Sequence, residues 1–205
     1  NPAPGDWGGL VVCGDAPTNK GSNVTSEVAD LTYGGSNMMD NSGSIRYLRV
    51  EYTGATFSND KEFNGVSLFG VGAGTTFEYV QSYQGGDDGI EFFGGTVSGD
   101  YLVSIGSGDD SIDFADGWQG DGSFWYIKDG AKAGIEGSNN GDDGNASPVT
   151  TTTLSNITVV GPVTEGALYF KEGGGSFTIT NFYTDAIDLG VKVKDTDAEA
   201  AVRIE

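Results

Sequence analysis

The sequence has no histidine, a single cysteine and few basic residues. Its 205 residues include 10 Lys and Arg against 30 Asp and Glu, which gives a formal net charge of −20. Without histidine, the chain lacks the commonest general base and a usual protein ligand of zinc, copper and iron. The one cysteine, Cys13, has no partner for a disulfide within the chain. It lies in the apolar run 10–13, where we expect a buried and inert thiol.

The shortage of basic residues limits the classes of partner. A strongly negative surface repels nucleic acid and anionic membranes, so no nucleic-acid partner is expected. No apolar run is long enough to cross a bilayer, so we expect no membrane insertion. The same charge attracts cations, although a solvated acidic surface without any bound ion has the same composition.

Glycine, in contrast, is abundant, with 35 residues, and it separates short runs rich in Val, Ile, Tyr, Phe and Thr. Glycine at this frequency indicates many tight corners. The short runs alternate between apolar and polar residues, and no run of ten residues has convincing helical periodicity. The composition therefore predicts an all-β fold.

Two neighbouring segments are near copies of each other. YVQSYQGGDDGIEFFGG (79–95) returns as YLVSIGSGDDSIDFADG (101–117), 22 residues later. A fixed period in the low twenties, with strand-like units and glycine corners, is typical of a solenoid. Coils stacked about 4.8 Å apart bury a continuous core that one coil cannot form alone. We predict a right-handed parallel β-helix with coils of about 22 residues, the hand following from that of parallel strand crossovers.

The repeat predicts a single β-helix domain over residues 1–205, with regular coils from residue 44 onward. Two polar stretches, 15–43 and 137–153, interrupt the pattern and are expected to be loop excursions at corners. The sequence ends without an obvious cap. We therefore expect this domain to be part of a longer protein, with further coils after residue 205.

Aligning the coils predicts which side chains face the core. The second strand of each coil supplies an inward column, namely Val66, Ile90, Ile112, Ile135, Leu168 and Ile187. The first strand supplies a recurring aromatic–aliphatic pair, at 47–48, 79–80, 101–102 and 126–127. Strand alternation then turns Glu91 and Asp113 outward. Four aromatic residues are expected at exposed corners, as stacked ladders or as sugar-binding faces, namely Tyr83, Phe93, Trp118 and Trp125.

Six carboxylates gather where the two copies repeat, namely Asp87, Asp88, Glu91, Asp109, Asp110 and Asp113. Carboxylates one strand spacing apart repel each other. Calcium would relieve the repulsion, because it takes six to eight oxygen ligands, including carboxylates. The six residues are therefore candidate calcium ligands. In the alternative interpretation, Asp88 and Asp110 only cap the glycine-rich turns. Neither unit matches an EF-hand loop, so the hypothesis depends on the ladder alone.

Catalysis is a further alternative, because parallel β-helices include enzymes that cleave pectin. The GDDS unit (108–111) is similar to the paired aspartates of polygalacturonases. Those enzymes also need Gly-His-Gly and Arg-Ile-Lys units, and both are missing here. Two carboxylates can still catalyse glycoside hydrolysis, and Asp110 with Asp113 is the first pair to test. No catalytic residue is assigned.

Four units in order resemble a family of secreted repeat proteins from Bacteroidetes and marine Gram-negative bacteria. They are GDWGGLVVCGDAP (5–17), YGGSNMMDNSGSIRYLRVEY (33–52), GVGAGTTFEYVQSYQGGDDGIEFFGGTV (70–97) and DDSIDFADGWQGD (109–121). The resemblance covers residues 5–121 and is looser beyond. It implies a β-helix outside the cell or on the outer cell surface of a bacterium, and it supplies no catalytic residues.

These observations predict a calcium-stabilised β-helix with a structural, adhesive or carbohydrate- or ligand-binding role. Two other functions stay open. One is a polysaccharide-active enzyme, either a lyase or a glycoside hydrolase. The other is a self-assembling filament or surface-layer subunit, because a solenoid with open ends can stack end to end. The expected partners are accordingly a polysaccharide or other copies of the chain.

Overall fold

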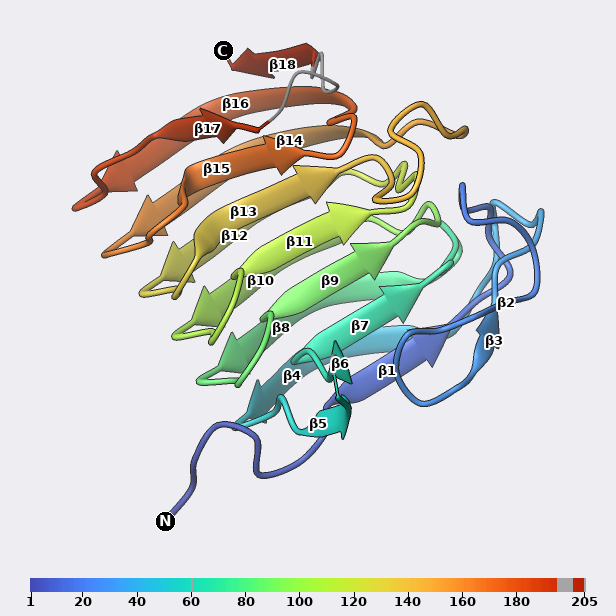
Figure 1. The fold of residues 1–205 in the computed structure, drawn as a ribbon, viewed down its shortest axis with the longest axis horizontal. Helices are drawn as coiled ribbons and strands as arrows, with labels where there is room; N and C mark the ends of the chain where they lie inside the picture. The colour runs from blue at the N-terminus through green and yellow to red at the C-terminus, as the bar shows by residue number, and fades with distance from the viewer. Residues whose placement is uncertain (60, 195–200, 205) are drawn as a thin grey trace.

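The protein is a parallel β-helix, in which successive strands alternate between two long sheets (Figure 1). The computed structural model describes residues 1–59 and 61–194 and the backbone of 201–204. Sheet 1 lies in front in Figure 1 and contains β1 (Leu10–Cys13), β7 (Val66–Phe69), β9 (Ile90–Phe93), β11 (Ile112–Ala115), β13 (Ala133–Ser138), β15 (Gly166–Lys171) and β17 (Val191–Val193). Sheet 2 lies behind it and contains β4 (Ser44–Glu51), β8 (Thr76–Tyr83), β10 (Gly99–Ile105), β12 (Gly122–Lys128), β14 (Thr151–Val160), β16 (Ser176–Asp185) and β18 (Ala201–Ile204).

All neighbouring strands within the two sheets are parallel, which confirms the predicted fold class. Two small antiparallel hairpins are added at corners. One pairs β2 (Val24–Thr25) with β3 (Thr32–Tyr33), and the other pairs β5 (Thr56–Ser58) with β6 (Lys61–Glu62). In the described part of the chain, no helix has the length and apolarity needed to span a membrane.

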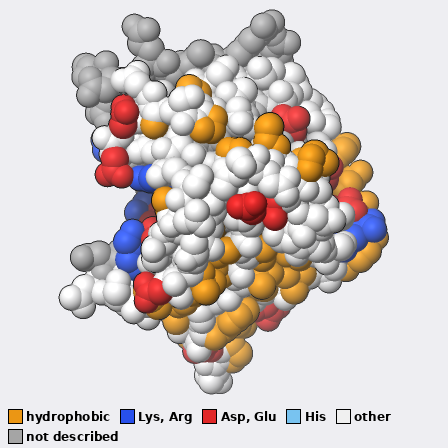
Figure 2. All heavy atoms as spheres, turned by 90° about the vertical axis from the view of Figure 1, so that its right-hand side faces the viewer, with side chains coloured by type: hydrophobic (Ala, Val, Ile, Leu, Met, Phe, Trp, Pro, Cys, Tyr) orange, Lys and Arg blue, Asp and Glu red, His pale blue; other side chains and the backbone are white. Residues whose placement is uncertain are grey.

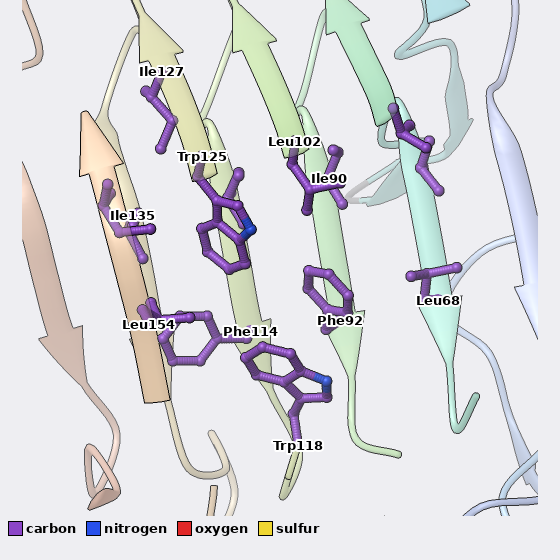
Figure 3. Packing of buried hydrophobic residues seen from close by; sticks show 14 of the residues in the cluster. Leu68, Ile90, Phe92, Leu102, Phe114, Trp118, Trp125, Ile127, Ile135 and Leu154 are labelled. Atoms are coloured by element: carbon purple, nitrogen blue, oxygen red, sulfur yellow. The ribbon is translucent and has the colours of Figure 1, made fainter. Parts of the chain in front are cut away.

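The core lies between the two sheets and is built from columns of apolar side chains. Val66, Ile90, Ile112, Ile135 and Leu168 lie side by side on consecutive strands and are fully buried. Figure 3 shows Leu68, Phe92 and Phe114 pointing into the same interior. Each such side chain stabilises the fold by about 1.5–3 kcal/mol relative to exposure. The predicted column is therefore confirmed over five coils.

The last member of that column was predicted wrongly. Leu168 pairs with Val191, whereas Ile187 lies in the corner between β16 and β17 and only packs against the edge of the core. The sequence spacing placed the final inward residue in the corner before β17, because β16 is longer than most other strands of its sheet. The outward residue of the last coil is consequently Lys192.

Two tryptophans expected at exposed corners are core residues. Trp118 and Trp125 are at most 1% exposed, and each indole N–H has a backbone carbonyl as its acceptor. Trp118 donates to the carbonyl of Val97 at 2.9 Å, and Trp125 donates to that of Gly99 at 2.8 Å. Trp125 lies beside Leu102, so the pair at 101–102 aligns with 124–125 and not with 126–127 as predicted. Phe93 is also buried, stacked on Phe69 at 4.1 Å.

A left-handed residue bends each long strand of sheet 2 at the same position. Its φ lies between 52° and 58° at Tyr47, Tyr79, Tyr101, Phe124, Asn156 and Asn181. The four rings stack with centroids 4.9, 4.5 and 4.9 Å apart, and we call them the aromatic ladder. The next two coils continue it with a hydrogen bond from Asn181 Nδ2 to Asn156 Oδ1. Stacked side chains therefore stabilise a strained backbone conformation.

The first excursion packs on the outer face of sheet 1. Val28 and Tyr33 from this excursion form a second apolar cluster with Phe69 and Phe93 of sheet 1. Cys13 is partly buried against this cluster, and desolvation raises the pKa of its thiol. The second excursion runs between β13 and β14, over residues 139–150, and Asn19 of the first excursion hydrogen bonds to it. The two excursions therefore support each other beside sheet 1.

Candidate metal centre

Carboxylates follow the outer face of sheet 1 from coil to coil. The register places Glu91, Asp113 and Glu136 side by side on β9, β11 and β13. Their neighbours Ile90 and Ile112 point the other way, into the core, as strand alternation predicted. The paired aspartates precede β9 and β11 at the corner. We call the whole set the acidic row, which consists of Asp87, Asp88, Glu91, Asp109, Asp110, Asp113 and Glu136.

The acidic row is enclosed rather than spread over the surface. It lines a hollow of about 370 Å³, together with Asn64, Tyr169 and several lysines. Asp88, Glu91, Asp110, Asp113 and Glu136 are only 4–8% exposed. On the face in Figure 2 the described acidic side chains stand in separate small groups. The row is therefore an unusual place in the molecule, because charged side chains are rarely buried without partners.

The carboxylate oxygens fall into three overlapping triads, in each of which the oxygens lie within 4.8 Å of one another. The first triad is Asp87, Asp88 and Asp109, the central triad is Asp88, Glu91 and Asp113, and the third triad is Asp110, Asp113 and Glu136. All six residues that the sequence proposed belong to a triad. The alignment of the coils also placed Glu136 in the outward row with Glu91 and Asp113, as the register confirms, but Glu136 was not among the candidate ligands.

Lysines neutralise the two ends of the row. Lys132 Nζ lies 2.6 Å from Asp109 Oδ2, and Lys171 Nζ lies 2.6 Å from Glu136 Oε1. Among the ion pairs that join described residues, none involves a carboxylate of the central triad. The centre of the row is therefore its least compensated part.

Only neutral groups hold the central triad. Asn64 Nδ2 donates to Glu91 Oε2 at 2.5 Å, and the backbone N–H of Asp110 donates to Asp88 Oδ1 at 2.8 Å. Asp113 Oδ1 is buried and has no hydrogen-bond partner. An unpaired buried oxygen of this kind costs roughly 1–3 kcal/mol, and more when it is charged. The central triad thus lacks a group that can pair with Asp113.

Burial and mutual repulsion raise the pKa values of five carboxyl groups in the row, those of Asp87, Asp88, Glu91, Asp110 and Asp113. Desolvation, followed by repulsion from a carboxylate on a neighbouring coil, holds the pKa of Asp88, Glu91 and Asp113 well above the usual range. Desolvation and then Glu136 raise the pKa of Asp110 to about 8, and desolvation and then Asp109 raise that of Asp87 to about 6. Without a cation, part of the row therefore keeps its protons at neutral pH.

The turn-capping interpretation of Asp88 and Asp110 does not match their contacts. Asp88 Oδ1 accepts from the N–H of Asp110, and Asp110 Oδ1 accepts from the N–H of Ala133, at 2.5 Å. Each carboxylate oxygen therefore accepts from a backbone N–H of the next coil. In an Asx-turn it would accept from the N–H two residues further along its own chain. The two aspartates therefore join coils, and each keeps its second oxygen for another partner.

Comparison with known proteins places the chain in a family. A model described as a pectate-lyase-like β-helix domain matches residues 1–205. No curated protein and no solved structure matches the chain. The match supports the predicted kinship with β-helix repeat proteins and agrees with the parallel coils described above. The chain belongs to the family of pectate-lyase-like β-helix domains.

Proposed function

We propose that the acidic row binds calcium and that the chain is an extracellular bacterial β-helix that binds anionic carbohydrate at this row. The observation that carries the proposal is the central triad. Three nearly buried carboxylates lie within 4.8 Å of one another, and one oxygen of Asp113 has no partner. Calcium fits because its ligands are oxygens in a flexible arrangement, and the family fold is compatible with a carbohydrate ligand.

The surroundings of the row suit an anionic ligand. Beyond Glu136 the row continues with Tyr169 and Lys192, and the Lys192 ammonium lies 4.1 Å from the centre of the Tyr169 ring. Lys132, Lys171 and Lys194 line the same hollow, in a chain with only 10 basic residues. An acidic polymer lying along the coils would meet a bound cation, an aromatic ring and lysines in turn. Calcium modules outside cells bind with dissociation constants of about 10⁻⁴–10⁻³ M, which suits an extracellular protein.

Thermal unfolding tests the calcium site. The chelator-treated chain is melted in calcium chloride and in sodium chloride of equal ionic strength. An ion that binds only the folded state adds about 2.7 kcal/mol of stability at a hundredfold excess over its dissociation constant. Calcium should therefore raise the melting temperature more than sodium does. Glu91→Gln should reduce the difference, whereas Asp30→Asn, at an exposed position in the first excursion, should leave it intact. Identical melting curves in the two salts would exclude the site.

Binding to an acidic polysaccharide tests the ligand. Affinity electrophoresis in gels containing polygalacturonate should retard the chain in calcium and release it in chelator. Lys192→Gln should weaken the retardation while leaving the calcium-dependent melting shift unchanged. A chain that binds calcium but migrates equally with and without the polymer would limit the function to calcium binding with a structural role.

Cleavage of such a polymer is the second candidate function. It is favoured by Asp110, whose raised pKa of about 8 would let it donate a proton at neutral pH beside Asp113. Carboxylate oxygens of Asp110 and Asp113 lie within 4.8 Å of each other. Retaining glycoside hydrolases typically have their two carboxyl groups about 5–5.5 Å apart. Release of reducing ends or unsaturated products, abolished by Asp110→Asn, would favour this function over binding alone. If the chain only binds, no product accumulates.

A further inference from the structure

Asp113 stands between two ligand sets. It belongs both to the central triad, with Asp88 and Glu91, and to the third triad, with Asp110 and Glu136. Its carboxylate has two oxygens. The residue is more than nine-tenths buried, and Oδ1 has no hydrogen-bond partner. A carboxylate in this position can bind one ion with each oxygen.

We infer that the acidic row holds two calcium ions, one in the central triad and one in the third triad, bridged by Asp113. This inference rests on the proposed function, because it requires that the row bind calcium at all. It adds Asp110 and Glu136 as ligands of a separate second ion.

The charge of the buried residues favours two ions. Asp88, Glu91, Asp110, Asp113 and Glu136 are the five nearly buried carboxylates of the row, and together they carry five negative charges when ionised. Lys171 neutralises one of these charges through its contact with Glu136. Two divalent ions neutralise the remaining four, whereas a single ion leaves two negative charges in a desolvated place. Uncompensated buried charge is costly, so the neutral arrangement is favoured.

The hydrogen bonds around the row leave the required oxygens free to bind ions. Asn64 holds Oε2 of Glu91, Lys171 holds Oε1 of Glu136 and the N–H of Ala133 holds Oδ1 of Asp110. Each carboxylate has a second oxygen, and the first contact fixes its orientation. Asp110 and Glu136 also share a side-chain hydrogen bond, whose proton an ion would replace. Glu91, Asp113 and Glu136 lie on consecutive strands, so the two ions would be about 4.8 Å apart. Each ion would have three protein carboxylates, and calcium's remaining positions would be open to water or to a ligand's carboxylate.

The first triad differs in its access to solvent. Asp87 and Asp109 are only half-buried, and Lys132 lies on Asp109. Asp109 Oδ1 is buried without a partner, like Asp113 Oδ1, but Lys132 pairs with the other oxygen of Asp109 and Asp87 reaches solvent, whereas all members of the third triad are nearly buried. A third ion is accordingly not part of the inference.

Calcium stoichiometry tests the inference. Equilibrium dialysis of the chelator-treated chain with calcium should give about two ions per chain. Glu91→Gln removes a ligand of the central triad only, and Glu136→Gln removes a ligand of the third triad only. Each variant should bind about one ion, and Asp113→Asn should lose most binding of both. Asp30→Asn, matched in chemistry but outside the row, should bind two.

The possible results separate the inference from the proposed function. About one ion in the unmodified chain, unaffected by Glu136→Gln, would overturn the second ion and leave the calcium site standing. No binding at millimolar calcium would overturn both. If Asp113→Asn does not fold, as judged by circular dichroism, the two single-site variants still decide. Loss of both ions in either of them would contradict two separate ligand sets.

Discussion

Each of the two sheets repeats one kind of side chain along its outer face, but the repeated contact is favourable on sheet 2 and unfavourable on sheet 1. On sheet 2 the aromatic ladder stacks four rings, with centroids 4.5–4.9 Å apart. On sheet 1 the acidic row places carboxylates on consecutive strands, with oxygens within 4.8 Å. The spacing is the same, because the coils set it. Each aromatic pair is favourable by about 0.5–1.5 kcal/mol. Two ionised carboxylates at this distance repel by about 3.5 kcal/mol at an effective dielectric constant near 20.

In a solenoid, the interaction between two neighbouring coils is repeated from coil to coil, so its free energy accumulates. The aromatic ladder is complete within the chain, because each added ring finds its partner on the previous coil. The acidic row becomes less favourable with each added carboxylate, and two lysines at its ends compensate only part of the charge. A repeated unfavourable pair therefore indicates that a group from outside the chain belongs there. Changes of pH, of the acids and of the rings therefore test the two faces separately.

The largest expected effect is that of pH on the chelated protein. In the folded state the pKa values of Asp87, Asp88, Glu91, Asp110 and Asp113 exceed their ordinary values, reaching about 6 for Asp87 and about 8 for Asp110. The folded state therefore prefers the protonated acids. Stability is complete below pH 4 and is lost as pH rises through about 8, by several kcal/mol over these five groups. Urea unfolding between pH 4 and 8 measures the loss, and calcium should largely remove it at neutral pH. If the free energy of unfolding in chelator does not change with pH, burial does not destabilise the ionised carboxylates of the row.

Neutralising the central triad should have opposite effects with and without calcium. Keeping an ordinary aspartic acid protonated at pH 7 costs about 4 kcal/mol, and an amide avoids this cost. Glu91→Gln combined with Asp113→Asn should therefore stabilise the chelated chain by about 2–4 kcal/mol. In saturating calcium the same pair should destabilise the chain relative to the unmodified protein. Urea midpoints in the two buffers give both values, and changes of equal sign would refute the ion.

Breaking the aromatic ladder should cost less and should not depend on calcium. Tyr79 stacks on Tyr47 and on Tyr101, so its loss removes two contacts of about 0.5–1.5 kcal/mol each. Tyr79→Asn keeps a residue that tolerates a φ of 56° and should lower stability by about 1–3 kcal/mol in either buffer. Tyr79→Phe keeps the stacking and is the matched control, with a change below about 0.5 kcal/mol. A calcium-dependent loss in Tyr79→Asn would mean that the two faces are coupled.

The period of 22 residues was enough to predict the coils and most of the inward column, because every coil buries the same positions. It did not predict where Trp125 lies. The left-handed residue in each long strand of sheet 2 shifts the alternation, and Phe124 joins the ladder instead of Tyr126. Such a backbone bend has no residue signature here, since Tyr, Phe and Asn all occupy it.

The acidic row was predicted as a set of residues but not as a buried set. Alternation alone turns Glu91 and Asp113 outward, which suggests exposure. Their burial depends on contacts far apart in the sequence, since Glu27 of the first excursion and Tyr169 of a later coil line the same hollow. The unpaired oxygen of Asp113 likewise follows from the absence of nearby donors, which no local pattern encodes.

The most direct test of the central claim is a crystal structure of the chain grown with calcium at pH 7, with anomalous scattering recorded at long wavelength. We expect an anomalous peak among the carboxylates of Asp88, Glu91 and Asp113, and a second one beyond Asp113 toward Glu136. A hollow that contains only water, with its carboxyl groups hydrogen bonded to one another in millimolar calcium, would contradict it.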